Sequence, residues 1–367
     1  VHEHPPLAKI LAAIPLLFIQ PNEPKPPPAH GGPEQDNDKW AYYAGFWDGN
    51  PNAFETISFW TRVPMIVCTV ILGLLIFVIA RNQFGSRAAL FSVALFSFEP
   101  TVLAHGRVVQ TDVPAALGYL VFFFVLYWYL RKPSWRRAVG LGGATALAIL
   151  AKFSMLLTGP VLLITFLALL WRTPRQQQSR LMLAKHALIV TFTVLLLINA
   201  AYFFHSRSLS EADVFWAQKS FPAHSVAVLR TVHSASFIVP TDFVLGIFWQ
   251  IWHNNEGHPS SMLGKQSRTG WWYYFPVAFA LKTTLPFLLL SLVSLAWATY
   301  QLVRKRDRRF FALLVPFAIY TAFVLFSKID IGVRYYLPAF PFLFILGGAF
   351  LHWLLETQRA RAAAIAL

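Results

Sequence analysis

Long apolar runs dominate the pattern of hydrophobic and polar positions along the chain. A helix that crosses a bilayer needs about 20 mostly apolar residues. The clearest stretches that approach or reach this length are 63–80, 113–130, 154–171, 187–204, 284–302, 310–327 and 337–355. Two weaker stretches, 88–104 and 138–151, let the connections alternate between the two sides of a membrane. The pattern therefore predicts an all-α polytopic membrane protein with about nine to ten transmembrane helices.

Two long polar segments interrupt these runs. Residues 1–62 contain a short apolar stretch at 7–19, which is too short to span and is expected to lie along the membrane interface. A Pro-rich stretch, PNEPKPPPAHGGP, follows and indicates an irregular loop. Residues 205–271 form the second polar segment, and the chain shows no internal repeat.

The distribution of Lys and Arg predicts the orientation. The chain holds 31 Lys and Arg against 16 Asp and Glu, and more than half of these cations fall on one set of alternate connections. Only two acids, Asp307 and Glu356, accompany them. Cytoplasmic loops carry the excess of Lys and Arg. We therefore expect four parts: a first extracytoplasmic loop with an interfacial helix (1–62), a transmembrane core (63–204), a large extracytoplasmic loop (205–271), and C-terminal transmembrane helices with a cytoplasmic tail (272–367).

Composition narrows the class of protein further. Hydrophobic residues make up 56% of the chain, charged residues 13%, and the mean hydropathy is +0.52. A soluble domain carries about 25% charged residues, so the chain has too little polar surface for a soluble globule and too much apolar content for disorder. The net charge of +15 reflects orientation rather than a nucleic-acid partner. Cys68 is the single cysteine, which excludes an intramolecular disulfide and a cysteine-based zinc site.

Ionisable groups at the outer ends of the apolar runs are the candidate functional residues, because such groups are costly near lipid unless paired or solvated. They are the acids Glu3 and Asp112, the cations Arg107, Lys152, Lys282 and Arg334, and the neighbouring His4 and His105. Cations at this boundary suit a phosphate whose tail stays in lipid, and an acid among them suits a general base. The set favours a lipid-phosphate-dependent transferase.

Structural interpretations of the same residues stay open. Arg107 could simply pair with Asp112, and Asp112 also suits the start of a helix. Lys152 could be an interfacial lysine whose ammonium group reaches the headgroups. Arg334 has Asp330 as a local counterion.

Five segments resemble the bacterial relatives of the protein O-mannosyltransferases, in the GT-C superfamily of phospholipid carrier-dependent glycosyltransferases. They are EHPPLAK, FEPTVLAHGRVVQTDVPAAL, LAILAKFSMLL, GWWYYFPVAFALKTTLPFLLL and IDIGVRYYLPAFPFLF. Together they run from about residue 1 to about residue 350. The resemblance implies a GT-C-like bundle with two extracytoplasmic loops. It also implies transfer of a sugar from a polyprenyl-phosphate donor to an acceptor hydroxyl, with inversion, at the extracytoplasmic side of a bacterial inner membrane.

The resemblance also assigns roles to residues. Glu3 and Asp112 become the candidate catalytic acids, while His4, His105, Arg107, Lys152, Lys282 and Arg334 become the candidate donor-phosphate-binding residues. The family usually carries a first transmembrane helix and an acidic pair ahead of the HPP element. This sequence begins with Val1 just after that place, so residues 1–62 are expected to be a truncated first loop.

Cofactors, partners and competing functions complete the expectations. No metal-binding motif is recognised, although a divalent cation is a further candidate for the site. The expected partners are the polyprenyl-phosphate-linked sugar, membrane lipid, and an acceptor that is a protein, a lipid or a glycan. The competing classes are a membrane transporter or lipid flippase, which also needs charge within the membrane, and a non-catalytic assembly subunit.

Overall fold

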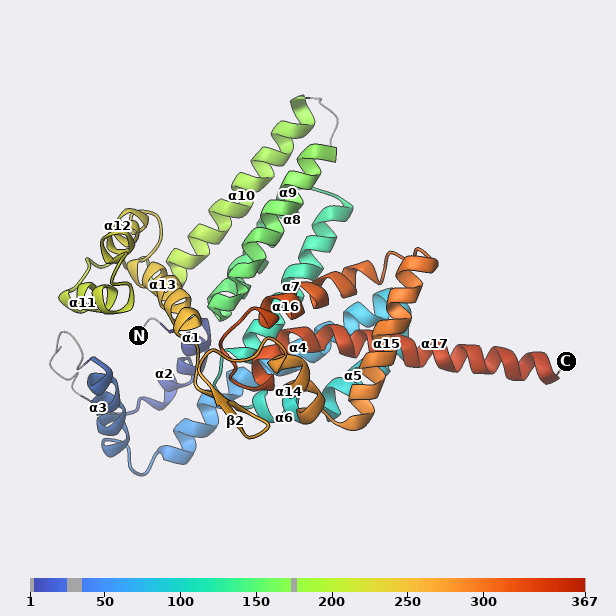
Figure 1. Ribbon diagram of the computed structural model, residues 1–367, viewed down its shortest axis with the longest axis horizontal. Helices are drawn as coiled ribbons and strands as arrows, with labels where there is room; N and C mark the ends of the chain where they lie inside the picture. Colours follow the sequence, from blue (N-terminus) through green and yellow to red (C-terminus); the bar gives the residue numbers. More distant parts are fainter. Residues whose placement is uncertain (1–2, 25–34, 173–176, 367) are drawn as a thin grey trace.

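The computed structural model describes residues 3–24, 35–172 and 177–366, which form a bundle of helices with a small β-hairpin near one end (Figure 1). The first half of the chain contains α1 (Leu7–Ala13), α2 (Leu16–Ile19), α3 (Gln35–Asp48), α4 (Phe54–Phe84), α5 (Ser86–Phe98), α6 (Pro100–His105), α7 (Asp112–Arg131), α8 (Trp135–Ala151), the 3-10 helix η2 (Phe153–Leu157), α9 (Thr158–Arg172) and α10 (Gln177–Ala201). The described part of the chain is therefore helical almost throughout, as the apolar pattern predicts.

The second half begins with a polar segment that folds into short elements. These are α11 (Glu211–Ser220), α12 (Ser225–Ala235), α13 (Thr241–Glu256), β1 (Ser260–Met262) and β2 (Lys265–Ser267), the two strands being antiparallel. The chain then continues through α14 (Tyr274–Lys282), α15 (Leu285–Arg304), α16 (Phe311–Leu325), the 3-10 helix η3 (Val333–Ala339) and α17 (Phe340–Ala366). In Figure 1, α11, α12 and α13 lie at the same end of the molecule as α1, α2 and α3.

Six stretches of the described residues are long and apolar enough to cross a membrane. They are Phe54–Phe84, Asp112–Arg131, Phe153–Arg172, Ser179–Ala201, Leu285–Arg304 and Val333–Gln358. The other three predicted stretches coincide with α5, α8 and α16, which have only 13, 17 and 15 residues. The chain is a multi-pass membrane protein, but the predicted count of nine to ten spanning helices is not confirmed.

Small residues allow the helices to approach closely, as is typical of packing within membranes. A Cβ added to Gly118 of α7 would lie 2.7 Å from the Ala148 Cα of α8. A Cβ added to Gly348 of α17 would collide with Ser92 of α5. These contacts place α7 against α8 and α17 against α5, with the N-terminal part of α17 almost wholly buried.

The basic connections pair with the two acids that the sequence assigns to their side. Glu356 of α17 accepts a hydrogen bond from Arg87 at the start of α5, at 2.5 Å. Asp307 and Arg309, in the connection between α15 and α16, form a 2.6 Å ion pair, and Arg309 also donates to the Gln83 carbonyl at the end of α4. The C-terminal end of α4, the start of α5, the connection after α15 and the part of α17 around Glu356 therefore lie together.

Candidate active site

A pocket of about 580 Å³ opens among the segments that surround the start of α7. This volume lies within the range typical of ligand-binding pockets. Its walls come from the N-terminal segment, residues 109–112, Lys152, α13 and residues 329–335. Its charged and histidine lining residues are Glu3, His4, Lys9, Asp112, Lys152, His253, His258 and Arg334. Segments far apart in the sequence thus converge on one cavity whose lining includes several ionisable side chains.

A buried ion pair lies in this pocket. Asp112 is the first residue of α7, and Lys152 occupies the extended turn between α8 and η2. The Lys152 Nζ donates to the Asp112 Oδ1 at 2.6 Å, and the two residues are only 5% and 4% exposed. The same ammonium lies 4.2 Å from the centroid of the Tyr335 ring, a cation–π contact. Lys152 is therefore held in place from two sides and is not a lysine free to reach the headgroups.

The segment before η3 brings Arg334 to the pocket. Gly332, with a φ of +98°, turns the chain into η3, where Arg334 lies half-buried in the lining. Asp330, the local counterion suggested by the sequence, instead accepts a hydrogen bond from the Trp271 backbone N–H at 2.9 Å. Burial raises the pKa of the Asp330 carboxyl, and this hydrogen bond opposes the increase.

The N-terminal segment forms another wall. Two prolines stiffen the backbone after His4, and the Glu3 carbonyl accepts a 2.8 Å hydrogen bond from the Gln250 Nε2 of α13. Burial, followed by the positive charge of Lys152, lowers the pKa of the His4 imidazole from 6.5 to about 4. Within the described part of the chain, its buried Nδ1 has no hydrogen-bond partner. His4 therefore presents a neutral imidazole near the ion pair at pH 7.

Helix α13 contributes residues that the sequence reasoning did not select. Trp249, Gln250 and His253 line the pocket from α13, and His258 follows just after the helix. The His253 Nε2 lies 3.3 Å from the His258 Nδ1, and burial together with His258 lowers the pKa of His253. The only local sign in the sequence is a dense run of aromatic residues and histidines at 248–258, inside a segment that otherwise resembles a loop.

Five of the eight residues selected from the sequence line this pocket: Glu3, His4, Asp112, Lys152 and Arg334. His105 lies beside it, since its Nδ1 is 3.3 Å from the Oε1 of the lining residue Gln110. Arg107 and Lys282 are exposed and are not part of the lining. The alternative pairing of Arg107 with Asp112 is replaced by the pairing of Asp112 with Lys152.

The donor atoms near the pocket do not form a ready metal site. In residues 3–24, 35–172 and 177–366, no group of three or more His, Cys, Asp or Glu side chains lies close enough to hold a metal ion. The described residues therefore do not by themselves form a site for a divalent cation.

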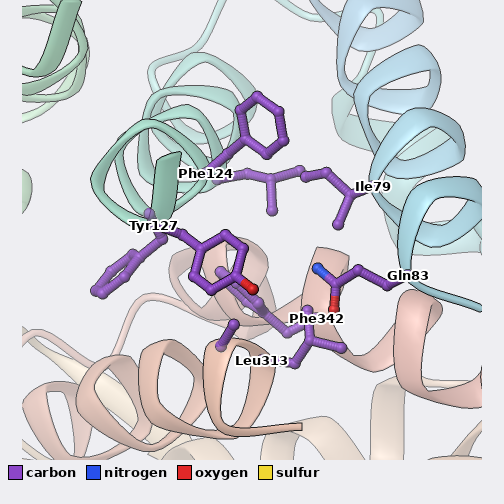
Figure 2. A pocket seen from close by; sticks show the side chains of 9 residues that line it. Ile79, Gln83, Phe124, Tyr127, Leu313 and Phe342 are labelled. Carbon is purple, nitrogen blue, oxygen red and sulfur yellow. The ribbon is translucent and has the colours of Figure 1, made fainter. Parts of the chain in front are cut away.

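A second cavity is far too small for a substrate. Figure 2 shows it between α4, α7, α16 and α17, with Ile79, Gln83, Phe124, Tyr127, Leu313 and Phe342 around it. Its volume is about 20 Å³, enough for about one water molecule. The large polar pocket at the start of α7 is thus the better candidate for chemistry.

Comparisons with solved structures show that the fold of this chain is similar to that of two membrane proteins. One similar structure is the oligosaccharyltransferase of Archaeoglobus fulgidus in its apo form, with a TM-score of 0.54 and 13% identity, covering 98% of this chain and 47% of that one. Another is ArnT from Cupriavidus metallidurans bound to undecaprenyl phosphate, with a TM-score of 0.53 and 17% identity, covering 95% and 49%. The chain thus spans about half the length of these proteins, and identities this low show the fold alone.

The family match comes from the sequence itself. Residues 54–201 match the family described as dolichyl-phosphate-mannose-protein mannosyltransferase. This match contains two of the five segments, 98–117 and 147–157, and confirms the resemblance to the protein O-mannosyltransferases over this part of the chain. A comparison with curated proteins found no match.

Proposed function

We propose that the chain is a membrane glycosyltransferase that takes a sugar from a polyprenyl-phosphate donor and transfers it to an acceptor hydroxyl. The observation that carries the proposal is the buried Asp112–Lys152 pair in a pocket that Arg334 also lines. Among the similar structures, ArnT is bound to undecaprenyl phosphate, and the archaeal oligosaccharyltransferase AglB from Archaeoglobus fulgidus is in complex with an inhibitory peptide and a dolichol-phosphate. AglB has a TM-score of 0.51 and 15% identity, covering 100% of this chain and 48% of that one. A lipid phosphate is therefore a reasonable ligand to test here.

The cations would stabilise the departing phosphate. Lys152 and Arg334 come to the pocket from different elements, so they could contact a phosphate from two directions. Electrostatic groups fixed before the reaction are most effective where charge develops in the transition state. The Asp112 Oδ1 accepts a hydrogen bond from the Lys152 Nζ at 2.6 Å, so the role of Asp112 in this proposal is to position that ammonium group.

Glu3 would then act as the general base. It lines the pocket, and its backbone is fixed by Gln250. In the proposed step, the Glu3 carboxylate takes the proton of the acceptor hydroxyl while the acceptor oxygen bonds to the anomeric carbon. The bond from that carbon to the phosphate oxygen breaks through an oxocarbenium-like state, and the polyprenyl phosphate leaves with the electron pair. The result is transfer with inversion.

We place the pocket on the extracytoplasmic side. The support is the charge pattern, because the Lys- and Arg-rich connections, which include Arg87 and Arg309, lie elsewhere on the molecule and have the composition of cytoplasmic loops. Residues 1–62 and 205–271 would then be extracytoplasmic, and the shorter helices α5, α8 and α16 would complete the predicted set of about nine spans.

Two arginine variants test the site. We expect Arg334→Ala to weaken binding of a polyprenyl phosphate by about tenfold or more in lipid nanodiscs, because a charge-assisted hydrogen bond typically contributes ~1.5–3 kcal/mol. Arg107→Ala, the matched control outside the pocket, should change the affinity by less than about threefold. The opposite ranking would show that the phosphate binds elsewhere.

Donor turnover tests the reaction. Purified protein in nanodiscs should release radiolabelled sugar from at least one polyprenyl-phosphate sugar, and Glu3→Gln should slow this release far more than it weakens donor binding. If the protein binds and moves the lipid without breaking the sugar–phosphate bond, the flippase is the correct function. If it binds no polyprenyl phosphate at all, the assembly-subunit interpretation is favoured.

A further inference from the structure

Two groups of residues that line the large pocket differ in chemistry. One group is the buried ion pair of Asp112 and Lys152 together with Arg334. The other group, Trp249, Gln250 and His253 from the C-terminal half of α13, contains neither an acid nor a Lys or Arg. A ligand that carries an anionic group and a neutral polar group next to it would match both groups.

Helix periodicity explains why the side chains of Trp249, Gln250 and His253 line the same pocket. Residues 249, 250 and 253 share one face of an α-helix, because positions three and four apart lie on the same side. The opposite end of α13 is anchored by the buried side chains of Phe243 and Leu245, so the helix is fixed in position over the pocket.

The indole of Trp249 is itself held in place. Its ring centroid lies 4.7 Å from that of His253, one turn further along the helix, and both residues line the pocket. The adjacent Gln250 donates to the Glu3 carbonyl, which joins this wall to the proposed general base. Trp252, on the same helix, contacts the Trp249 and His253 rings but does not line the cavity.

We propose that Trp249 is a stacking platform for a pyranose ring, with Gln250 and His253 within reach of the sugar hydroxyls. A pyranose has an apolar face of C–H groups, which packs favourably on an aromatic ring, and hydroxyls around its edge that need hydrogen-bond partners. A wall of one indole, one amide and one imidazole supplies both kinds of contact. This inference rests on the proposed function for the anionic half of the ligand, but it concerns a different wall of the pocket.

The pyranose could belong to the donor or to a glycan acceptor, and binding measurements separate these sources. For a donor sugar, Trp249→Ala should weaken binding of a polyprenyl-phosphate sugar by about tenfold while the affinity for bare polyprenyl phosphate changes by less than about twofold. For an acceptor sugar, the same variant should leave donor affinity unchanged and raise the KM for a glycan acceptor by about tenfold. Trp249→Phe should retain most of the wild-type behaviour. Trp272→Ala, which removes an exposed indole outside the pocket lining, should match the wild type.

Saturation-transfer NMR with methyl pyranosides gives a readout that does not depend on turnover or on a lipid phosphate. Signal transfer to the sugar ring protons should occur with wild-type protein and with Trp272→Ala, and it should be lost with Trp249→Ala. If Trp249→Ala retains that transfer, or if it weakens bare and sugar-linked polyprenyl phosphate equally, the platform does not exist. If polyprenyl phosphate does not bind the wild type but the pyranoside signal still depends on Trp249, the proposed function fails and the sugar site stands.

Discussion

Replacing Lys152 by Met should leave the Asp112 carboxylate buried without its cation. The Lys152 Nζ and the Asp112 Oδ1 are 2.6 Å apart, and both residues are at most 5% exposed. Removing one partner of a buried ion pair typically costs ~3–5 kcal/mol, because the remaining charge has lost both water and partner. We therefore expect Lys152→Met to lower the free energy of unfolding by that amount.

Replacing the other partner of the ion pair, Asp112, should lower the free energy of unfolding by a smaller amount. In Asp112→Asn the Lys152 ammonium keeps the Tyr335 ring, 4.2 Å from its Nζ. A cation–π contact of a desolvated ammonium contributes ~0.5–2 kcal/mol, so this variant should be about 1 kcal/mol more stable than Lys152→Met. The double variant removes both charges and should be more stable than the sum of the single costs predicts, with a coupling energy of ~2–3 kcal/mol.

Reversible unfolding by SDS in mixed micelles measures these differences. Lys328→Met is the matched control, because Lys328 is exposed and its substitution should change the free energy of unfolding by less than ~0.5 kcal/mol. If the two single costs simply add in the double variant, or if Lys152→Met costs less than ~1 kcal/mol, the ion pair does not stabilise the folded protein. A folded double variant that no longer binds polyprenyl phosphate would separate folding from function.

Three further predictions concern the surroundings of the pocket. Because burial lowers the native pKa of His4 from 6.5 to about 4, the unfolded chain takes up a proton in that interval that the native protein does not. Stability should therefore fall as the pH falls from about 6.5 to about 4, and SDS unfolding at pH 7 and pH 5 should show a smaller difference for His4→Gln. Gln250→Leu removes one hydrogen bond to the N-terminal segment, so donor turnover should slow about fivefold. An unchanged turnover number would argue against positioning of this segment by Gln250. Gly270→Ala should lower the melting temperature more than Gly264→Ala does. Both glycines have a positive φ, but only at Gly270 would an added Cβ collide with the Asp330 carboxylate. Equal changes in melting temperature would mean that this contact relaxes without cost.

The sequence by itself determined where the helices form and which ends carry charge. Each apolar run coincides with a helix because bilayer thickness and backbone hydrogen bonding act on a local stretch of chain. Helix ends were less predictable. Helix α4 begins at Phe54, well before its apolar run, because helical hydrogen bonding continues through residues of mixed polarity. One of these is Glu55 in the first turn, where the helix dipole favours an acid. The sequence also indicated five of the pocket's lining residues, because ionisable groups near lipid are costly unless they are solvated or paired.

Only the tertiary structure decided which of these ends meet. Asp112 and Lys152 are 40 residues apart, and their pairing depends on the close packing of α7 on α8 at Gly118. Arg107 is exposed, although it lies nearer to Asp112 in the sequence than Lys152 does. Trp249 and its neighbours reach the pocket because α13 contacts η2 and its Gln250 donates to the Glu3 carbonyl, and no local pattern encodes these long-range contacts. Hydrophobic periodicity specifies the environment of each segment, whereas the choice of neighbours depends on how all the helices pack at once.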